Sequence, residues 1–135
     1  MKLCPELPPT PLRTMIEKFA QDHSNLEEPY YAEDECWDIS VKFVRFVGHA
    51  LDGMLELRLV GVGDHPPYKR YCGDKADHWV IAAGEWMIDF TARQFHRWFA
   101  FPRVWREPKR KGKKIKNEKV ATDGFTVPLR NQLYR

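Results

Sequence analysis

Residues 77–95, DHWVIAAGEWMIDFTARQF, contain the clearest structural pattern in the chain. Two short apolar runs, 78–83 and 86–90, are joined at Ala83-Gly84-Glu85. Apolar runs of this length on either side of a glycine-containing turn are typical of a β-hairpin. The stretch therefore predicts two antiparallel strands in the centre of the fold.

Two polar residues interrupt this otherwise apolar hairpin. His78 begins the first predicted strand and Asp89 lies near the end of the second, so the two are about equally far from the turn. Residues placed in this way can be cross-strand neighbours. We therefore expect the His78 imidazole and the Asp89 carboxylate to form a hydrogen bond.

The flanking sequence predicts helices before the hairpin and one more strand beside it. Thr10-Pro11 is a typical helix start, with threonine as the N-cap, and a helix is expected to about Ala20 or Asp22. Asp34 is expected to cap a second helix that ends at Leu51-Asp52-Gly53. The remaining expectations are a loop at 23–33, a strand at 54–62, a loop before His78, a packed aromatic segment at 92–105 and a short strand at 125–127. The order of elements predicts an α+β fold, with helices packed on a small antiparallel sheet.

Composition limits the class of protein. The chain has 135 residues, of which 43% are hydrophobic and 13% aromatic, enough for one domain with a real core. No apolar run of eighteen residues is present, so no membrane partner is expected. The proline-rich start lacks the apolar centre of an export signal, and the three cysteines are widely separated. These features predict a cytoplasmic protein with reduced thiols.

Positive charge is concentrated in residues 103–119. This segment has nine basic and two acidic residues, a net charge of +7, so the rest of a chain with +3 overall carries −4. We expect a solvated loop segment within the single domain. The residues that a nucleic acid or an acidic protein would contact are Lys109, Arg110, Lys111, Lys113 and Lys114.

Cys36 gives the His78–Asp89 pair a possible chemical role. It falls in the first turn of the helix expected at 34–51, where unpaired backbone N–H groups and the helix dipole favour a thiolate. A thiol nucleophile needs a base, and that imidazole needs an acceptor to fix its tautomer. Cys36, His78 and Asp89 supply these three groups.

The order of these motifs resembles that of papain-like and transglutaminase-like cysteine enzymes, in particular small bacterial members. The motifs are Cys36-Trp37 at a helix start, His78-Trp79-Val80, and Ile88-Asp89-Phe90-Thr91-Ala92-Arg93-Gln94-Phe95. The resemblance covers about residues 30–100 and depends mainly on the hairpin. It implies a papain-like or transglutaminase-like fold.

The resemblance also implies a reaction. Cys36 would be the nucleophile, His78 the general base and then acid, and Asp89 the orienting carboxylate of a hydrolase or acyl transferase. The substrate would be an amide, either a peptide bond or a glutamine side chain of a protein or peptide, and no cofactor would be needed. For the oxyanion donor, Gln21, Asn25 and the Cys36 amide all stay open.

Acidic residues surround Cys36 in the sequence. Nearby negative charge opposes thiolate formation, so the base His78 becomes essential to an enzyme of this kind. The same charge favours a cationic or neutral substrate over an acidic one. The residues concerned are Glu27, Glu28, Glu33, Asp34, Glu35 and Asp38.

Simpler interpretations of the same residues stay open. A lone cysteine on an apolar helix face is usually a core residue, and the histidine and aspartate could be structural. A zinc site using His65, Cys72 and His78 lacks paired ligand spacing and a fourth ligand. The alternative function is a non-enzymatic binding module that holds nucleic acid or an acidic protein through its basic segment.

Overall fold

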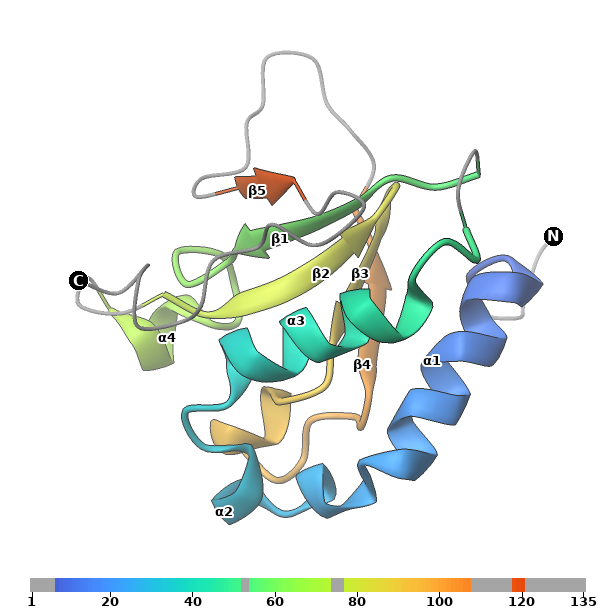
Figure 1. The fold of residues 1–135 in the computed structure, drawn as a ribbon. Coiled ribbons are helices and arrows are strands. Elements are labelled where there is room, and N and C mark those ends of the chain that lie inside the picture. The colour runs from blue at the N-terminus through green and yellow to red at the C-terminus, as the bar shows by residue number, and fades with distance from the viewer. Residues whose placement is uncertain (1–6, 52–53, 74–76, 108–117, 121–135) are drawn as a thin grey trace, which may run out of the picture.

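The computed structural model describes residues 7–51, 54–73, 77–107 and 118–120, the last three for their backbone only. The first half of this part is helical and the second half is mainly a sheet (Figure 1). The helices are α1 (Thr10–Asp22), η1 (Ser24–Glu27), α2 (Pro29–Ala32), α3 (Cys36–Val47), α4 (Lys69–Cys72) and η2 (Ala92–Gln94). The strands are β1 (Leu57–Gly61), β2 (Trp79–Ala83), β3 (Trp86–Asp89), β4 (Arg103–Arg106) and β5 (Glu118–Val120).

Within the described residues the strands form one five-stranded antiparallel sheet of order β4-β3-β2-β1-β5. The predicted hairpin is its centre, with Ile81 opposite Ile88 and Ala83 opposite Trp86. The turn needs a residue at positive φ, and Gly84, at φ 60°, supplies it without steric cost. The expected α+β class is confirmed.

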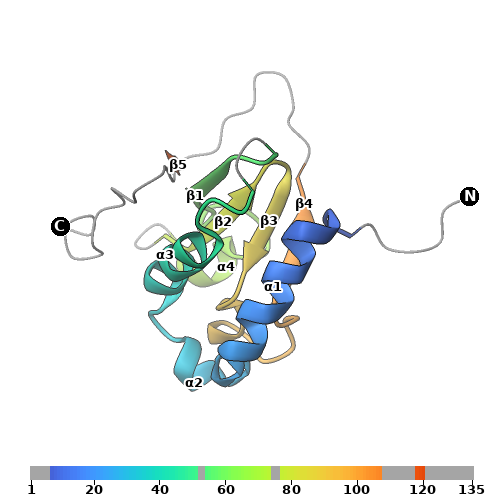
Figure 2. The same ribbon diagram turned by 45° about the vertical axis from the view of Figure 1, so that its right-hand side comes forward.

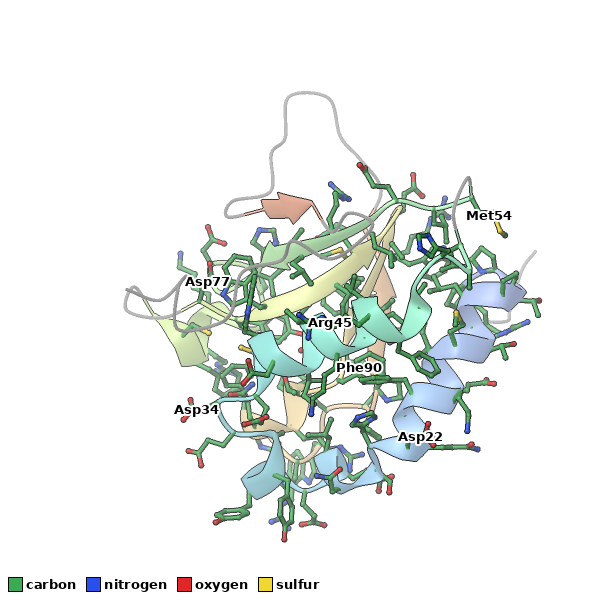
Figure 3. All side chains as sticks on the ribbon, in the orientation of Figure 1. Asp22, Asp34, Arg45, Met54, Asp77 and Phe90 are labelled. Carbon is green, nitrogen blue, oxygen red and sulfur yellow. The ribbon has the colours of Figure 1, made fainter. Side chains whose placement is uncertain are left out.

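Helices α1 and α3 pack on one face of the sheet (Figures 1 and 2). Three phenylalanines from different elements meet there: ring centroids of Phe19 and Phe43 are 5.2 Å apart, and Phe90 is 4.7 Å from Phe19. Phe90 lies beneath α3 in Figure 3. Side chains alternate along a strand, so Leu57, Leu59, Trp79, Ile81, Ala83 and Ile88 share this face.

A second, smaller core covers the opposite face. Its buried members are Val60, Val62, Tyr68, Val80, Ala82 and Met87. Phe95, Trp105 and Cys72 pack against it from the segments after β3, in β4 and at the end of α4. Because both faces are covered, every residue of β2 is buried, and a polar residue on this strand must find its partners inside the protein.

Helix α3 differs from the prediction at both ends. It begins at Cys36 after Glu35, whereas Asp34 stands outside the helix at φ 62°. The helix ends at Val47, and Gly48, which has a positive φ, is the cap residue and donates its N–H to the Val44 carbonyl. The end had been expected at Gly53, which lies outside the described residues. Glycine takes this conformation without the cost that a Cβ imposes, so the earlier of the two glycines ends the helix.

Three predicted loops contain regular structure. The loop expected before His78 contains α4, at Lys69–Cys72. Residues 23–33 form η1 and α2, in which Leu26 and Ala32 are buried, so these turns are held by packing despite the lack of periodicity. The segment at 103–119 was expected to be a solvated loop. It begins with β4, which pairs with β3, and its last two residues belong to β5, which pairs with β1.

The first helix is confirmed with a different cap residue, and two other predicted segments lie outside the described residues. Helix α1 begins at Thr10, preceded by Pro9 as the cap residue, and ends at Asp22. Residues 108–117 of the basic segment and the strand expected at 125–127 lie outside the described residues. Among the helices that are described, none has the length and apolar character to cross a membrane.

Candidate functional site: a buried Cys-His-Asp constellation

His78 and Asp89 form the hydrogen bond expected from the hairpin. The distance from His78 Nε2 to Asp89 Oδ2 is 2.7 Å, and both side chains are 1% exposed. They are diagonal neighbours: His78 precedes β2, Asp89 ends β3, and both lie on the face of the second core. A carboxylate can only accept a hydrogen bond, so Nε2 carries a proton and donates it to Asp89. Nδ1 is then the nitrogen that can interact with a nucleophile.

Asp89 is held by hydrogen bonds to both of its oxygens. Oδ1 accepts from the backbone N–H of Thr91 (2.9 Å) and from the Thr91 hydroxyl (3.3 Å). Oδ2 accepts from His78 and from the Tyr68 hydroxyl, each at 2.7 Å. A buried carboxylate with this many donors stays ionised and keeps one orientation.

Cys36 is the first residue of α3 and is half-buried. Its neighbours in the chain locate it beside His78: the rings of Trp37 and Trp79 are 4.8 Å apart at a steep angle, and the Ser40 hydroxyl donates to the Trp79 carbonyl at 3.3 Å. The start of α3 thus lies at the end of the sheet where β2 begins (Figure 1). The amides in the first turn of a helix have no acceptor within it, so they face the same region.

The charges of the three residues are coupled. Burial by itself lowers the pKa of His78, but the charge and hydrogen bond of Asp89, together with the Cys36 thiol, raise it to about 10. Burial raises the pKa of Asp89, but His78, Tyr68 and Thr91 outweigh that effect and lower it. The carboxylate and the imidazolium therefore stabilise each other as a buried ion pair.

His78 Nδ1 is buried and makes no well-formed hydrogen bond within the described residues. The Cys36 thiol nevertheless lies near enough to influence the pKa of this imidazole by hydrogen bonding and charge. We take the thiol to be adjacent to Nδ1 but not in full hydrogen-bond geometry, which is usual for a catalytic pair without substrate. The structure thus brings Cys36, His78 and Asp89 together.

Aromatic rings enclose the imidazole. The centroid of the His78 ring is 4.6 Å from that of Tyr68 and 4.8 Å from that of Phe95. These rings keep water from the His78–Asp89 hydrogen bond and restrict rotation of the imidazole. Phe95 belongs to the motif quoted above, whereas Tyr68 comes from the loop before α4.

Gln94 connects the aspartate to the segment that precedes the cysteine. Its Nε2 donates to the Thr91 hydroxyl at 3.3 Å, and its Oε1 accepts from the Asp34 backbone N–H at 3.3 Å. The same hydroxyl donates to Asp89 Oδ1 at 3.3 Å. One chain of hydrogen bonds therefore runs from Asp89 to the turn just before α3, and it fixes the position of Cys36 relative to the hairpin. Asp34 and Asp77, which precede α3 and β2, lie on the same side of the molecule in Figure 3.

The candidate oxyanion donors are in different places. Gln21 is exposed near the end of α1, and Asn25 is exposed in η1. The Cys36 amide is in the first turn of α3, beside its own sulfur. Among the three, the amide is best placed to stabilise charge that develops on an acyl group attacked by that sulfur.

The other candidate ligands do not gather around a metal. His65 lies beside Asp64 and Glu107, with its Nε2 3.6 Å from the Asp64 carboxylate. Cys72 is half-buried at the end of α4, where burial foremost, and then the charges of Asp77, Cys36 and Asp89, raise the pKa of its thiol to about 11. In the part of the chain that the structure describes, no three His, Cys, Asp or Glu side chains are arranged to hold a metal ion.

Comparison of this chain with family models, curated proteins and solved structures found no match.

Sequence reasoning missed two members of the site, Tyr68 and Arg103. Arg103 Nη1 donates to the Tyr68 hydroxyl at 2.9 Å, and Tyr68 donates to Asp89. Tyr68 lies in a stretch without periodicity, and Arg103 was assigned to the solvated basic segment. The signal for Arg103 was its position in an aromatic context, between Phe99 and Trp105, where no strand was expected.

Proposed function

We propose that the protein is a cysteine-nucleophile hydrolase or acyl transferase, of the papain-like or transglutaminase-like kind, which acts on an amide through a thioester. The main support is the state of His78: Asp89 binds Nε2 at 2.7 Å, the buried Nδ1 has no hydrogen-bond partner in the described part, and the Cys36 thiol is near enough to raise the pKa of the ring. A histidine that served only to stabilise the core would be expected to have both nitrogens satisfied.

The reaction follows from this arrangement. The thiol proton resides on Nδ1, in the imidazolium that Asp89 stabilises, and Cys36 Sγ attacks the carbonyl carbon while the first amides of α3 stabilise the oxyanion. The C–N bond breaks as the imidazolium gives its proton to the leaving nitrogen, which leaves a thioester on Cys36. Water or an amine then attacks the thioester and loses its proton to Nδ1, which restores the imidazolium, and the C–S bond breaks to release Cys36 Sγ. Water yields hydrolysis or deamidation, and an amine yields a crosslink.

The surroundings of Cys36 favour a cationic or neutral acyl donor. Glu27, Glu28, Glu33 and Asp34 are exposed on η1, α2 and the turn before α3. The carboxylates of this surface attract a positively charged peptide and repel an acidic one. A donor with lysine or arginine near the scissile amide should therefore react faster than its glutamate analogue, and the difference should diminish as salt is added.

Selective labelling with iodoacetamide tests the nucleophile. Cys36 should be alkylated well before Cys72, because a thiol whose pKa is about 11 is roughly one part in ten thousand thiolate at pH 7. It should also react before Cys4. The change His78→Ala should remove the advantage of Cys36, whereas Cys72→Ser should leave it intact as the matched control.

An activated ester completes the test, because a thioester enzyme should release its first equivalent of alcohol in a burst. Equal labelling of all three thiols, or preferential labelling of Cys36 that persists in the His78→Ala protein, would reject the proposed function. A structure with a thiol-directed covalent probe on Cys36 would identify the groove that binds substrate.

A further inference from the structure

Asp89 Oδ2 is shared equally by two donors. The His78 Nε2–H and the Tyr68 hydroxyl each donate to this one oxygen at 2.7 Å. Among the described residues, the donors to the other oxygen, Oδ1, both belong to Thr91. The oxygen that faces the proposed catalytic base therefore has part of its negative charge taken up by a tyrosine.

The tyrosine is itself fixed on its other side. Arg103 Nη1 donates to the Tyr68 hydroxyl oxygen at 2.9 Å, so the hydroxyl proton is directed to Asp89. The Arg103 guanidinium lies 4.1 Å from the centroid of the Trp105 ring and 5.3 Å from that of the Tyr68 ring. Arg103 is also the strand partner of Asp89, since β3 and β4 pair at these two residues. Packing, strand register and hydrogen bonding all hold the guanidinium in this place.

We propose that Tyr68, held by Arg103, is a positioning residue that acts on His78 through Asp89 Oδ2 and thereby limits how strongly the aspartate holds the imidazolium. This inference rests on the proposed function, because the limit matters only if His78 must give up a proton. Neither residue touches the substrate in this scheme; both act through the carboxylate.

The physical basis is competition for one oxygen. A carboxylate oxygen that accepts a hydrogen bond from Tyr68 has less electron density to offer to His78 Nε2–H. A weaker hold on the imidazolium makes it a better acid for the leaving nitrogen in the acylation step. Burial and the charge of Asp89 raise the pKa of Tyr68, so the hydroxyl stays protonated and remains a donor across the working pH range.

The charged and titratable groups around the imidazole come from several elements. They are Cys36 at the start of α3, Asp89 at the end of β3, Tyr68 and Cys72 at the two ends of α4, Asp77 just before β2, and Arg103 of β4. Asp77 Oδ1 accepts hydrogen bonds from the backbone N–H groups of Gly63 and His78. Among these groups Tyr68 is the second donor on the oxygen that binds His78.

The change Tyr68→Phe isolates the hydroxyl, because the ring that packs on His78 is kept. With one donor removed from Oδ2, the imidazolium should be held more strongly, and the NMR titration midpoint of His78 should rise by about one pH unit. The proton shared by His78 Nε2 and Asp89 should move further downfield at neutral pH. The His78→Gln protein identifies the resonances that belong to this residue.

Two further variants test the sign of the effect. A 3,5-difluorinated ring at Tyr68 is a stronger donor, so it should lower the titration midpoint and shift the shared proton upfield. The change Arg103→Gln removes the cation that polarises the hydroxyl and should act in the same direction as Tyr68→Phe, whereas Arg103→Lys should restore much of the original midpoint. If the Phe protein does not fold, the fluorinated protein still gives the answer.

The outcomes separate this inference from the proposed function. Opposite shifts for the Phe and difluorinated proteins support the inference, whether or not Cys36 proves to be a nucleophile. The inference is overturned if the folded variants leave the His78 titration midpoint and the chemical shift of the shared proton unchanged. It is also overturned if the Phe and difluorinated proteins shift these two quantities in the same direction. If Cys36 is selectively alkylated while these readouts stay fixed, the proposed function survives and Tyr68 is only a packing residue. In an active enzyme, Tyr68→Phe should lower kcat by less than about tenfold and leave KM unchanged.

Discussion

The change Asp89→Asn should remove both activity and a large part of the stability. An asparagine retains an oxygen for Thr91, but its NH2 group replaces Oδ2 and faces two other donors, the Tyr68 hydroxyl and His78 Nε2–H. His78 can relieve this conflict by moving its proton from Nε2 to Nδ1. The proton then points to Cys36, so the imidazole can no longer accept the thiol proton.

The expected magnitudes follow from this geometry. Loss of the correct tautomer in a nucleophile–histidine–aspartate system lowers the rate by about 10⁴-fold. Removing one member of a buried ion pair costs roughly 3–5 kcal/mol, which for a chain of this size corresponds to a fall in Tm on the order of 10 °C. Asp89 and His78 are each 1% exposed, so solvent does not screen this loss.

Iodoacetamide labelling of Cys36 and thermal unfolding measured by circular dichroism provide the assay. Asp22→Asn is a matched control, because the same chemical change is made in an exposed i,i+4 pair with Lys18 that is worth only about 0–1 kcal/mol. An Asp89→Asn protein that labels at the wild-type rate and melts within about 2 °C of it would refute the reasoning about His78 and its tautomer.

Three other expectations concern different parts of the molecule. The change Gly61→Ala would bring a methyl group into steric conflict with the Asp77 carboxylate, so the free energy of unfolding, measured by urea denaturation, should decrease by about 1–3 kcal/mol. The decrease should be smaller when the same change is made in the Asp77→Ala protein. The stability that His78 contributes through the ion pair should be fully present below pH 6.5 and should decrease as the pH rises towards about 10. At acid pH the contribution of the pair should be lost as Asp89 is protonated. Urea denaturation of the His78→Gln protein, measured as a function of pH, should lack the alkaline decrease. Replacing Lys109, Arg110, Lys111, Lys113 and Lys114 by alanine should abolish salt-sensitive binding to a polyanion while the alkylation rate of Cys36 stays unchanged, and a fall in that rate would mean that the segment covers the site.

The hairpin and its two polar residues could be predicted because the necessary information is local. Two apolar runs and Gly84 specify the turn, and the turn specifies that His78 and Asp89 lie at the same end of neighbouring strands. The ring pair Trp37–Trp79 shows why Cys36 was also placed well: the residues next to the cysteine and the histidine pack on each other. The order of these residues along the chain was therefore enough to predict the His78–Asp89 hydrogen bond and to propose Cys36 as its neighbour.

The residues that sequence reasoning missed depend on contacts between distant segments. Tyr68 is 21 residues from Asp89 and 35 from Arg103, and nothing in the local sequence indicates either contact. Strand β4 was not predicted, because Arg103 and Arg106 were assigned to the basic segment, although both residues pair with β3. The end of α3 was misplaced because two glycines followed the apolar pattern, and only the backbone conformation at Gly48 distinguishes them.

Strand β5 has a consequence for association between molecules. It pairs with β1, placing Arg58 opposite Val120 and Val60 opposite Glu118, and so occupies hydrogen-bonding groups that would otherwise form an open sheet border. The β1 sequence, LRLVG, has a single charge, so an uncovered β1 would be a template for strand addition from a second molecule. A chain shortened before Glu118 should therefore form dimers or larger aggregates in a concentration-dependent way, even with the Cys36 region intact. The opposite border, β4, has arginine at both ends, and such charges discourage the same kind of pairing.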